Sequence, residues 1–394
     1  MNIPGVIHLG SRYLARHRTK AVLLISAITL SLFLPLGISL VVRQAEEQLR
    51  ARANSTPLVL GAKGSPLELV FNGLYFSMPD LTPFPLGEAE QLLGDEQKKA
   101  KTVIPIYSRF EAKKHPIVGT SLEYFRFRGL EVAEGRMMTR LGDCVIGSGV
   151  AKKLGLGPDE RLLSKSEQMI GLTGVRPLNM RITGVLTPTS GPDDHAVFVD
   201  LKTTWIIEGI AHGHNEATPE TTLEEQEGNT ALNAAVIPYN EITDENVDSF
   251  HFHGETSEFP ISAAIVIPRD RKKAETMLLG EYISDTSLFQ MIRPGDVMTE
   301  LFATVFRIRD LVVVALVAVG LASALIAGLV FLLSNRLRAR EFESLANIGA
   351  DPATTRALLF FEAGFVILSS VVLAGILLAT LNLIIPKLLP VLMA

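Results

Sequence analysis

The chain has 394 residues, of which 47% are hydrophobic and 20% charged, and its formal net charge is -5. A mean hydropathy of +0.29 is too apolar for an ordinary soluble protein, yet the charged fraction requires much of the chain to lie in water. The composition therefore predicts membrane spans joined to one large water-exposed domain. No basic stripe that could neutralise phosphates is present, which argues against a nucleic-acid partner.

The N-terminal segment, residues 1–20, is predicted to be an amphipathic helix on the cytoplasmic membrane surface. Apolar side chains recur at helical spacing from Val6, and four basic residues with no acidic one lie largely off that line. By the positive-inside rule, this charge places the N-terminus in the cytoplasm. Residues 21–42 carry no charge and are predicted as the first transmembrane helix. A secretory signal peptide is the alternative, but the run exceeds the ~7–15 residues of a signal-peptide apolar region and no A-x-A-like site follows.

Residues 43–310 have the composition of a soluble α+β domain. Cys144 is the only cysteine, so the domain must fold without an intrachain disulfide. Short β-type runs bounded by glycine and proline are expected at 57–60, 101–107, 116–118, 143–146, 179–186, 196–201, 231–237 and 261–267. Helices are expected at 44–53, 148–154, 269–282 and 294–309. The last begins with Pro294 and leads into the next apolar run, so we expect one continuous helix from the domain into the membrane.

Residues 311–334 and 357–386 are predicted as the second and third transmembrane helices. Each contains a charge-free run longer than the ~20 residues that cross a bilayer. Prolines at 386 and 390 are expected to interrupt the third helix and to leave 387–394 as an extracytoplasmic tail. The predicted fold class is therefore an α-helical membrane protein with three spans and a large α+β extracytoplasmic domain.

The second predicted span contains three small residues at i, i+4 and i+8, namely Gly320, Ala324 and Gly328. Small residues at this spacing let two helices approach closely within lipid, which predicts a packing face. The alternative is that glycine and alanine are simply frequent in membrane helices.

The charged segment 335–356 between these spans is predicted to lie in the cytoplasm, because three arginines follow the second span. A helix running through Leu337 is expected to end at Gly349, since glycine readily adopts the left-handed conformation at a helix end. Asp351 is expected to cap a second helix that starts at Pro352 and enters the membrane. Glu362 at this entry is costly unless it stays at the interface or finds a basic partner.

Residues 340–368, REFESLANIGADPATTRALLFFEAGFVIL, resemble a segment of the FtsX-like, or MacB-like, permeases of ABC transporters. Residues 118–136, 144–162 and 181–201 are similar to the periplasmic core domain of MacB-like permeases. The similarity spans most of the chain. The permease pattern is a basic and acidic pair, a leucine, an Ile-Gly-Ala turn and a glutamate, matched here by Arg340, Glu341, Leu345, Ile348, Gly349, Ala350 and Glu362.

This resemblance implies a multi-pass permease of the bacterial inner membrane, surrounded by lipid and paired with a second permease, identical or different. It also implies a separate cytoplasmic ATPase that docks within residues 336–355, and a periplasmic adaptor is a further candidate partner. The family usually has a fourth membrane helix, so the chain is either a three-span variant or lacks its C-terminus. The residues expected to couple to the ATPase are Arg336, Arg340, Glu341, Leu345, Ile348, Gly349, Ala350 and Asp351.

No nucleotide-binding or catalytic motif is found in the sequence. The stretch GAKGSPL at 61–67 has glycines without the spacing that cradles phosphates, and neither G-x-S-x-G nor H-E-x-x-H occurs. Cys144 lies in an expected strand, where a buried structural thiol is the straightforward interpretation. The chain is therefore predicted not to be an enzyme and to hold no cofactor of its own, with ATP bound by its partner.

Two His-x-His pairs, His212 with His214 and His251 with His253, lie in a His- and Glu-rich insert at about 208–256. In an extended chain, each pair presents both imidazoles on one side, which makes a candidate zinc or copper site. Residues 193–195, Asp-Asp-His, could add ligands. The alternative is that these are surface histidines in a solvated insert, of which 215–227 is expected to be a mobile loop.

The sequence thus predicts a permease subunit that couples ATP hydrolysis by a separate ATPase to movement of the extracytoplasmic domain. Such movement would export or release a substrate from the periplasm or outer leaflet. One alternative is a transmembrane regulator that activates a periplasmic partner enzyme. Another is a metal-linked transport component that uses the His-x-His pairs.

Overall fold

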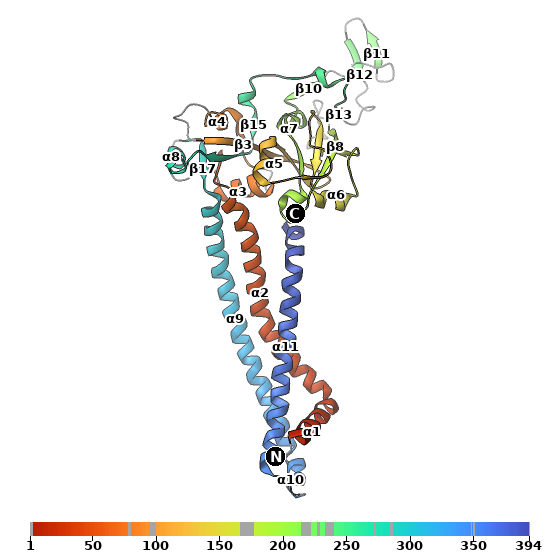
Figure 1. Cartoon of the computed structure of the whole chain (residues 1–394), viewed down its shortest axis with the longest axis vertical. Helices are drawn as coiled ribbons and strands as arrows, with labels where there is room; N and C mark the ends of the chain where they lie inside the picture. The colour runs from red at the N-terminus through yellow and green to blue at the C-terminus, as the bar shows by residue number, and fades with distance from the viewer. Residues whose placement is uncertain are drawn as a thin grey trace. The chain divides into compact units, whose positions relative to one another are not determined.

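The structure is a computed structural model of the chain, and it forms two compact units (Figure 1). The helical unit comprises Met1–Gln48 and Leu301–Leu389, and the sheet unit consists mainly of Leu49–Glu300. The residues that the structure describes are 3–77, 80–93, 100–165, 177–213, 222–226, 229–232, 240–270, 273–283, 287–347, 349 and 351–393.

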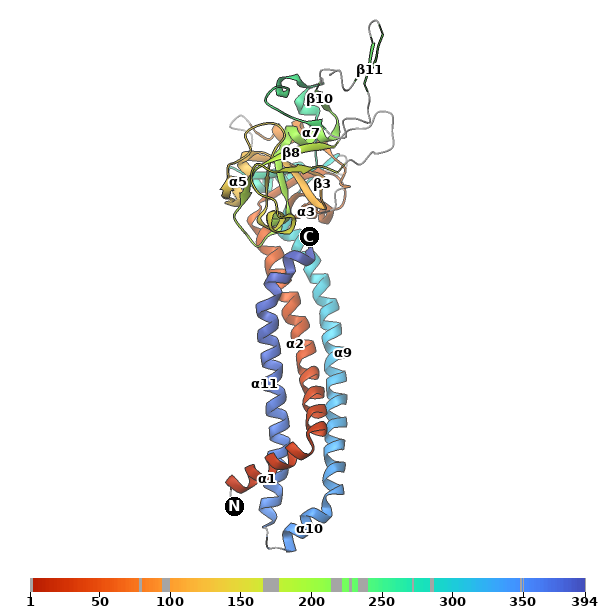
Figure 2. The same ribbon diagram turned by 90° about the vertical axis from the view of Figure 1, so that its right-hand side faces the viewer.

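In its described residues, the helical unit contains three long helices and two short ones. The long helices α2, α9 and α11 lie side by side in both views, and α1 crosses α11 near its start (Figure 1 and Figure 2). Within the described chain, three helices are long and apolar enough to cross a membrane, with mean hydropathies of 2.4 to 2.7. The helices are α1 (Ile3–Arg16), α2 (Arg18–Ser55), α9 (Pro294–Leu337), α10 (Ala339–Asn347) and α11 (Pro352–Met393).

Small and polar side chains bring the long helices together. Ser370 of α11 donates from Oγ to the carbonyl of Ile25 in α2 at 3.3 Å, and Thr29 Oγ1 donates back to the Ser370 carbonyl at 3.4 Å. On α1, a side chain at Gly10 would collide with the ring of Phe361. Contacts of this kind suit helices in lipid, where close backbone approach and interhelical hydrogen bonds drive association.

Helix α9 confirms the expected continuity, since it runs unbroken for 44 residues from Pro294. Helix α11 corrects another expectation, because it continues to Met393 past Pro386 and Pro390 instead of ending there. Proline removes one helical hydrogen bond, yet apolar helices tolerate the loss, and α2 likewise contains Pro35. The predicted helix through Leu337 is in fact two helices, which are separated at Arg338.

The sheet unit is built on a mixed sheet of eleven described strands, in the order β13-β8-β6-β9-β4-β3-β16-β1-β17, with β5 and β7 also paired to β8. Most strand pairs are antiparallel, whereas β4 with β9, β6 with β8 and β13 with β8 are parallel. The strands are β1 (Leu58–Ala62), β3 (Ala100–Ala112), β4 (His115–Thr120), β5 (Val132–Gly135), β6 (Asp143–Ile146), β7 (Arg161–Leu163), β8 (Leu178–Leu186), β9 (Val197–Asp200), β13 (Asn240–Glu241), β16 (Ala263–Pro268) and β17 (Phe289–Ile292).

Short helices and small ribbons surround this sheet. Trp205 of α7 packs in the core, with its indole Nε1 donating to the Pro260 carbonyl at 2.8 Å. The helices are α3 (Pro66–Tyr75), α4 (Leu86–Glu90), α5 (Leu122–Arg128), α6 (Ser148–Leu154), α7 (Leu201–Glu208) and α8 (Lys273–Glu281), with 3-10 turns η1 (Pro192–His195), η2 (Val247–Ser249) and η3 (Thr256–Glu258). The ribbons pair β2 (Phe84–Pro85) with β15 (Pro260–Ile261), β10 (Ala211–Gly213) with β14 (Phe250–Phe252), and β11 (Thr222–Gln226) with β12 (Asn229–Leu232).

The expected α+β pattern is present in this unit. The runs expected at 143–146 and 179–186 fall on β6 and β8, and the strand at 57–60 falls on β1. In the expected loop at 215–227, residues 222–226 instead form β11, and the other residues lie outside the described chain.

Candidate functional site

The segment between α9 and α11 contains α10 and a turn. Gly349 has a φ of 91°, which confirms the left-handed conformation expected for it. Asp351 Oδ1 accepts a hydrogen bond from the backbone N–H of Ala353 at 3.0 Å, so Asp351 caps α11 as expected. These two residues separate α10 from α11 and set where α11 begins.

Arg338 lies between the last residue of α9 and the first residue of α10. Its side chain is 10% exposed, and that of Glu362 in α11 is 2% exposed. The Nη1 group of Arg338 donates to both carboxylate oxygens of Glu362, each at 3.0 Å. Removing one partner of a buried ion pair leaves the other charge unpaired, so this contact holds the junction of α9 and α10 onto α11.

Aromatic rings flank the same guanidinium group. Its central carbon lies 3.6 Å from the ring centroid of Tyr13 in α1 and 4.9 Å from that of Phe342 in α10. Both distances are within the range of favourable cation–π contacts. The Nε group donates to Glu341 Oε2 at 3.1 Å, and the Glu341 side chain is 64% exposed. One arginine therefore contacts α1, α10 and α11.

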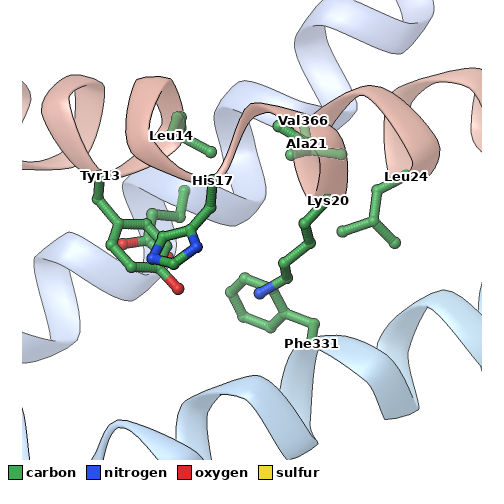
Figure 3. A pocket seen from close by; sticks show the side chains of 9 residues that line it. Tyr13, Leu14, His17, Lys20, Ala21, Leu24, Phe331 and Val366 are labelled. Atoms are coloured by element: carbon green, nitrogen blue, oxygen red, sulfur yellow. The ribbon is translucent and has the colours of Figure 1, made fainter.

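A second helix break lies beside the first. His17 separates α1 from α2, and its ring centroid is 4.5 Å from that of Tyr13. Figure 3 shows these two rings next to each other. Lys20 reaches α9, where its Nζ donates to Ser334 Oγ at 2.5 Å and lies 5.6 Å from the ring centroid of Phe331.

Tyr13, His17, Lys20, Phe331 and Glu362 line a cavity of about 10 Å³, which has room for about one water molecule. We call Tyr13, His17, Lys20, Arg338 and Glu362 the Arg338 cluster. It joins both helix breaks to α11. Arg338 cannot leave Glu362 without leaving a buried charge unpaired in an apolar environment.

The residues predicted to contact an ATPase lie around this cluster. Arg336 and Arg340 are exposed, as is Glu341 beside Arg338. Leu345 lies within α10, whereas Ile348 and Ala350 lie outside the described residues. The exposed charges of α10 are therefore accessible to a partner, and their coupling role stays a prediction.

The sequence interpretation did not include Arg338 among the coupling residues. A signal for it was present, because Glu362 at a membrane entry requires either an interfacial position or a basic partner. Three arginines, at 336, 338 and 340, could supply that partner. Arg338, the middle one, is the partner because the helix breaks there. Sequence periodicity could not identify it, because periodicity assumes an unbroken helix.

The small residues of α9 are not equivalent in the structure. At Gly320, an added Cβ would lie 3.5 Å from the Cβ of Ser31 in α2, so this glycine sits at a helix contact. Ala324 and Gly328 are exposed, and nothing lies within 4 Å of a Cβ at Gly328. Their packing against another helix stays a prediction.

The histidine pairs lie in the sheet unit. The register of β10 and β14 places His212 opposite His251, and the rings of His251 and His253 are 4.7 Å apart. His214 lies outside the described residues. No group of three or more His, Cys, Asp or Glu side chains among the described residues could hold a metal ion. Of the suggested additional ligands, Asp193 binds Arg52 instead, and metal binding by the pairs stays a prediction.

Cys144 lies buried in β6. Burial, with the charge of Asp143 adding to it, raises the pKa of its thiol well above the ordinary value. A thiol that stays protonated is a poor nucleophile, which fits the structural role expected for this residue.

A known protein family matches more than half of the chain. The sequence profile described as "MacB-like periplasmic core domain" matches residues 21–239, more than half of the chain. The crystal structure of the periplasmic region of MacB from Actinobacillus actinomycetemcomitans is 12% identical, with 63% of this chain and 94% of that chain covered and a TM-score of 0.34. The extracellular domain of the noncanonic ABC-type transporter YknZ from Gram-positive bacteria is also 12% identical. The match covers 60% of this chain and 98% of that chain, with a TM-score of 0.33. No curated protein sequence matches the chain.

Proposed function

Since the chain belongs to the MacB-like periplasmic core domain family, which is associated with ABC transporters, we propose that it is a permease subunit driven by a separate ATPase. Helices α2, α9 and α11 span the inner membrane in this proposal, with the sheet unit on the extracytoplasmic side and α10 in the cytoplasm. The basic N-terminal segment and the arginines after α9 support this orientation, because positive charge is retained on the cytoplasmic side.

The observation that carries the proposal is the buried pair of Arg338 and Glu362. The ATPase docks on the exposed charged face of α10, and ATP binding and hydrolysis displace that helix. Because Arg338 is bound to Glu362 and stacked on Tyr13, the displacement passes to α11 and α1. Continuous α9 then transmits it to the sheet unit along the 44 residues of one helix.

The substrate is taken up on the extracytoplasmic side and expelled or handed on there. This route needs no polar tunnel through the membrane, and residues 311–333 and 363–386 contain no charged side chain that would line one. A permease of this kind pairs with a second copy or a related chain through its exposed apolar helix faces.

Purification of the tagged full-length chain in mild detergent from its native host tests the proposal. We expect a near-stoichiometric ATPase subunit to accompany the chain. The double variant Arg340→Glu/Glu343→Arg reverses two exposed charges of α10 and should release the ATPase. Lys202→Glu, an exposed charge reversal on α7 of the sheet unit, is the matched control and should retain it. Absence of any ATPase under conditions that preserve other membrane complexes would contradict the proposal.

A further inference from the structure

A second buried arginine, Arg52, lies in the last two turns of α2, which belong to the sheet unit. Its side chain is 11% exposed, and all three guanidinium nitrogens donate hydrogen bonds. Nε donates to the Leu74 carbonyl at 2.5 Å, and Nη1 donates to Asp193 Oδ2 at 2.6 Å. Nη2 donates to Asp193 Oδ1 at 3.0 Å and to the Tyr124 hydroxyl at 2.7 Å. This two-pronged contact fixes the direction of the side chain as well as its position.

Both carboxylate oxygens of Asp193 also accept hydrogen bonds. Tyr124 also donates from its hydroxyl to Asp193 Oδ1 at 2.6 Å, and the Asp193 side chain is 4% exposed. Burial acts to raise the pKa of Asp193, but the charge and hydrogen bonds of Arg52, with the Tyr124 hydroxyl, outweigh it and hold the pKa below its usual range. The pair therefore stays charged at neutral pH.

Neighbouring contacts restrain the same helix end. Arg128 of α5 donates to Ser55 Oγ at 3.1 Å and to Thr56 Oγ1 at 2.9 Å. The Tyr75 hydroxyl donates to the Leu49 carbonyl at 2.5 Å. The loop before η1 is held in turn by Asp194, which accepts from the backbone N–H groups of residues 189 and 190 at 2.8 Å each. The partners of Arg52 are therefore themselves fixed.

Sheet topology shows why this contact matters. The chain passes from α2 into β1, which lies beside β17 at one end of the sheet, and β17 is followed by α9. Covalent connection alone would attach both helices at that end. Asp193 precedes β9 and Tyr124 follows β4, and these two strands are neighbours in the middle of the sheet. Arg52 thus attaches α2 at a second, distant point.

We propose that Arg52, Asp193 and Tyr124 form a rigid joint that makes the end of α2 and the middle of the sheet move as one body. Arg52 is a positioning residue in this joint. If the proposed function holds, the joint passes motion that arrives along α2 directly to β4 and β9. This role in transmission rests on the proposed function. The rigidity itself does not depend on an ATPase, so it can be tested without one.

Electron spin resonance on the full-length chain in detergent provides the test. Spin labels at Ala51→Cys in α2 and Lys152→Cys in α6 both lie on exposed positions of the sheet unit. Native Cys144 is buried and escapes labelling. We expect one narrow distance distribution, which broadens at least twofold in Asp193→Asn and less in Tyr124→Phe. Arg43→Met removes an exposed arginine of the same helix that pairs with Glu47, and this matched control should leave the width unchanged.

The fluorescence of Trp205, the single tryptophan, shows whether each variant is folded. If Asp193→Asn does not fold, Tyr124→Phe and Arg52→Lys carry the test, since both keep the charge balance of the cluster. The joint would be overturned if a folded variant of Arg52, Asp193 or Tyr124 kept the parent's distance distribution, or if the distribution were already broad in the parent. Either result leaves the ATPase partnership untouched, because that partnership is tested by co-purification.

Discussion

Arg52 and Arg338 each bind a buried carboxylate beside a tyrosine, but the backbone around them differs. Arg52 lies within an unbroken helix, and its three nitrogens bind fixed partners. Arg338 lies between two helices, and one of its partners, Glu341, is 64% exposed. The same ion-pair chemistry therefore serves two purposes. In our proposals, the pair in the continuous helix fixes a joint, and the pair at the helix break keeps two helical segments attached while they turn.

Breaking the Arg52 joint should have the largest effect on stability. Asp193→Ala leaves a buried guanidinium group unpaired, and we expect the free energy of unfolding of the sheet unit to fall by about 3–5 kcal/mol. Denaturant unfolding followed by Trp205 fluorescence measures this loss. As a control, Arg43→Ala removes an exposed pair with side chains 73% and 64% exposed and should change little. A loss as small as the control's would mean that Arg52 is not held as the structure shows.

Breaking the Arg338 cluster should reduce the stability less than breaking the Arg52 joint. In Glu362→Leu, Arg338 keeps Glu341 and two aromatic rings, so we expect a loss of roughly 1.5–3 kcal/mol, the range for hydrogen bonds to charged groups. Thermal unfolding of the helices, followed by circular dichroism, measures it. The double variant Arg338→Met/Glu362→Leu should recover most of the stability, because apolar replacement of a whole buried pair is often neutral. No recovery would indicate that the pair is bound to further polar groups.

Changing the turn after α10 should have a smaller, local effect. Gly349 has a φ of 91°, and a side chain there meets no neighbour within 4 Å, so the cost is conformational. Leucine in a left-handed conformation costs about 1–2 kcal/mol, equivalent to roughly 5- to 30-fold faster local amide exchange in α10. Gly349→Asn should be milder, because asparagine tolerates this conformation. Equal exchange in Gly349→Leu and the parent would show that the turn does not constrain α10.

Lowering the pH should slightly reduce the stability of the sheet unit, because His115 becomes protonated more readily in the unfolded chain. Burial lowers the pKa of His115, whose Nδ1–H donates to the His195 carbonyl at 3.0 Å. The unfolded chain therefore takes up a proton first as pH falls below about 6.5, so stability is present above that pH and is lost on going from pH 7 toward pH 5. His115→Gln should show a shallower decline in the thermal midpoint of Trp205 fluorescence. An identical decline would assign the pH dependence to other groups.

Local sequence patterns were sufficient to predict the helices and strands, but they did not predict the contacts between residues far apart in the sequence. Charge-free length predicted α2, α9 and α11, and alternation bounded by glycine and proline predicted strands such as β6 and β8. Gly349 and Asp351 were predictable because helix ends are set by residues within one turn.

The two arginine clusters were not predictable in this way. Asp193 lies 141 positions from Arg52, and Glu362 lies 24 positions from Arg338 across a helix break and a turn. Nothing in a periodic pattern selects one arginine from several when its partner is brought near by tertiary structure. The cost of burying Glu362 did indicate that some basic partner exists, so burial energetics can reveal a cluster before its members are known.

The most direct test of the account asks whether the Arg338 cluster transmits the action of the ATPase. Spin labels at Arg12→Cys in α1 and Leu329→Cys in α9 both lie on exposed positions of the helical unit. With the co-purified ATPase, trapping with ATP and orthovanadate should change the distance between them in the parent. In Arg338→Met/Glu362→Leu, we expect the ATPase to remain bound while the distance change is lost. The same distance change in the parent and the double variant would contradict the account.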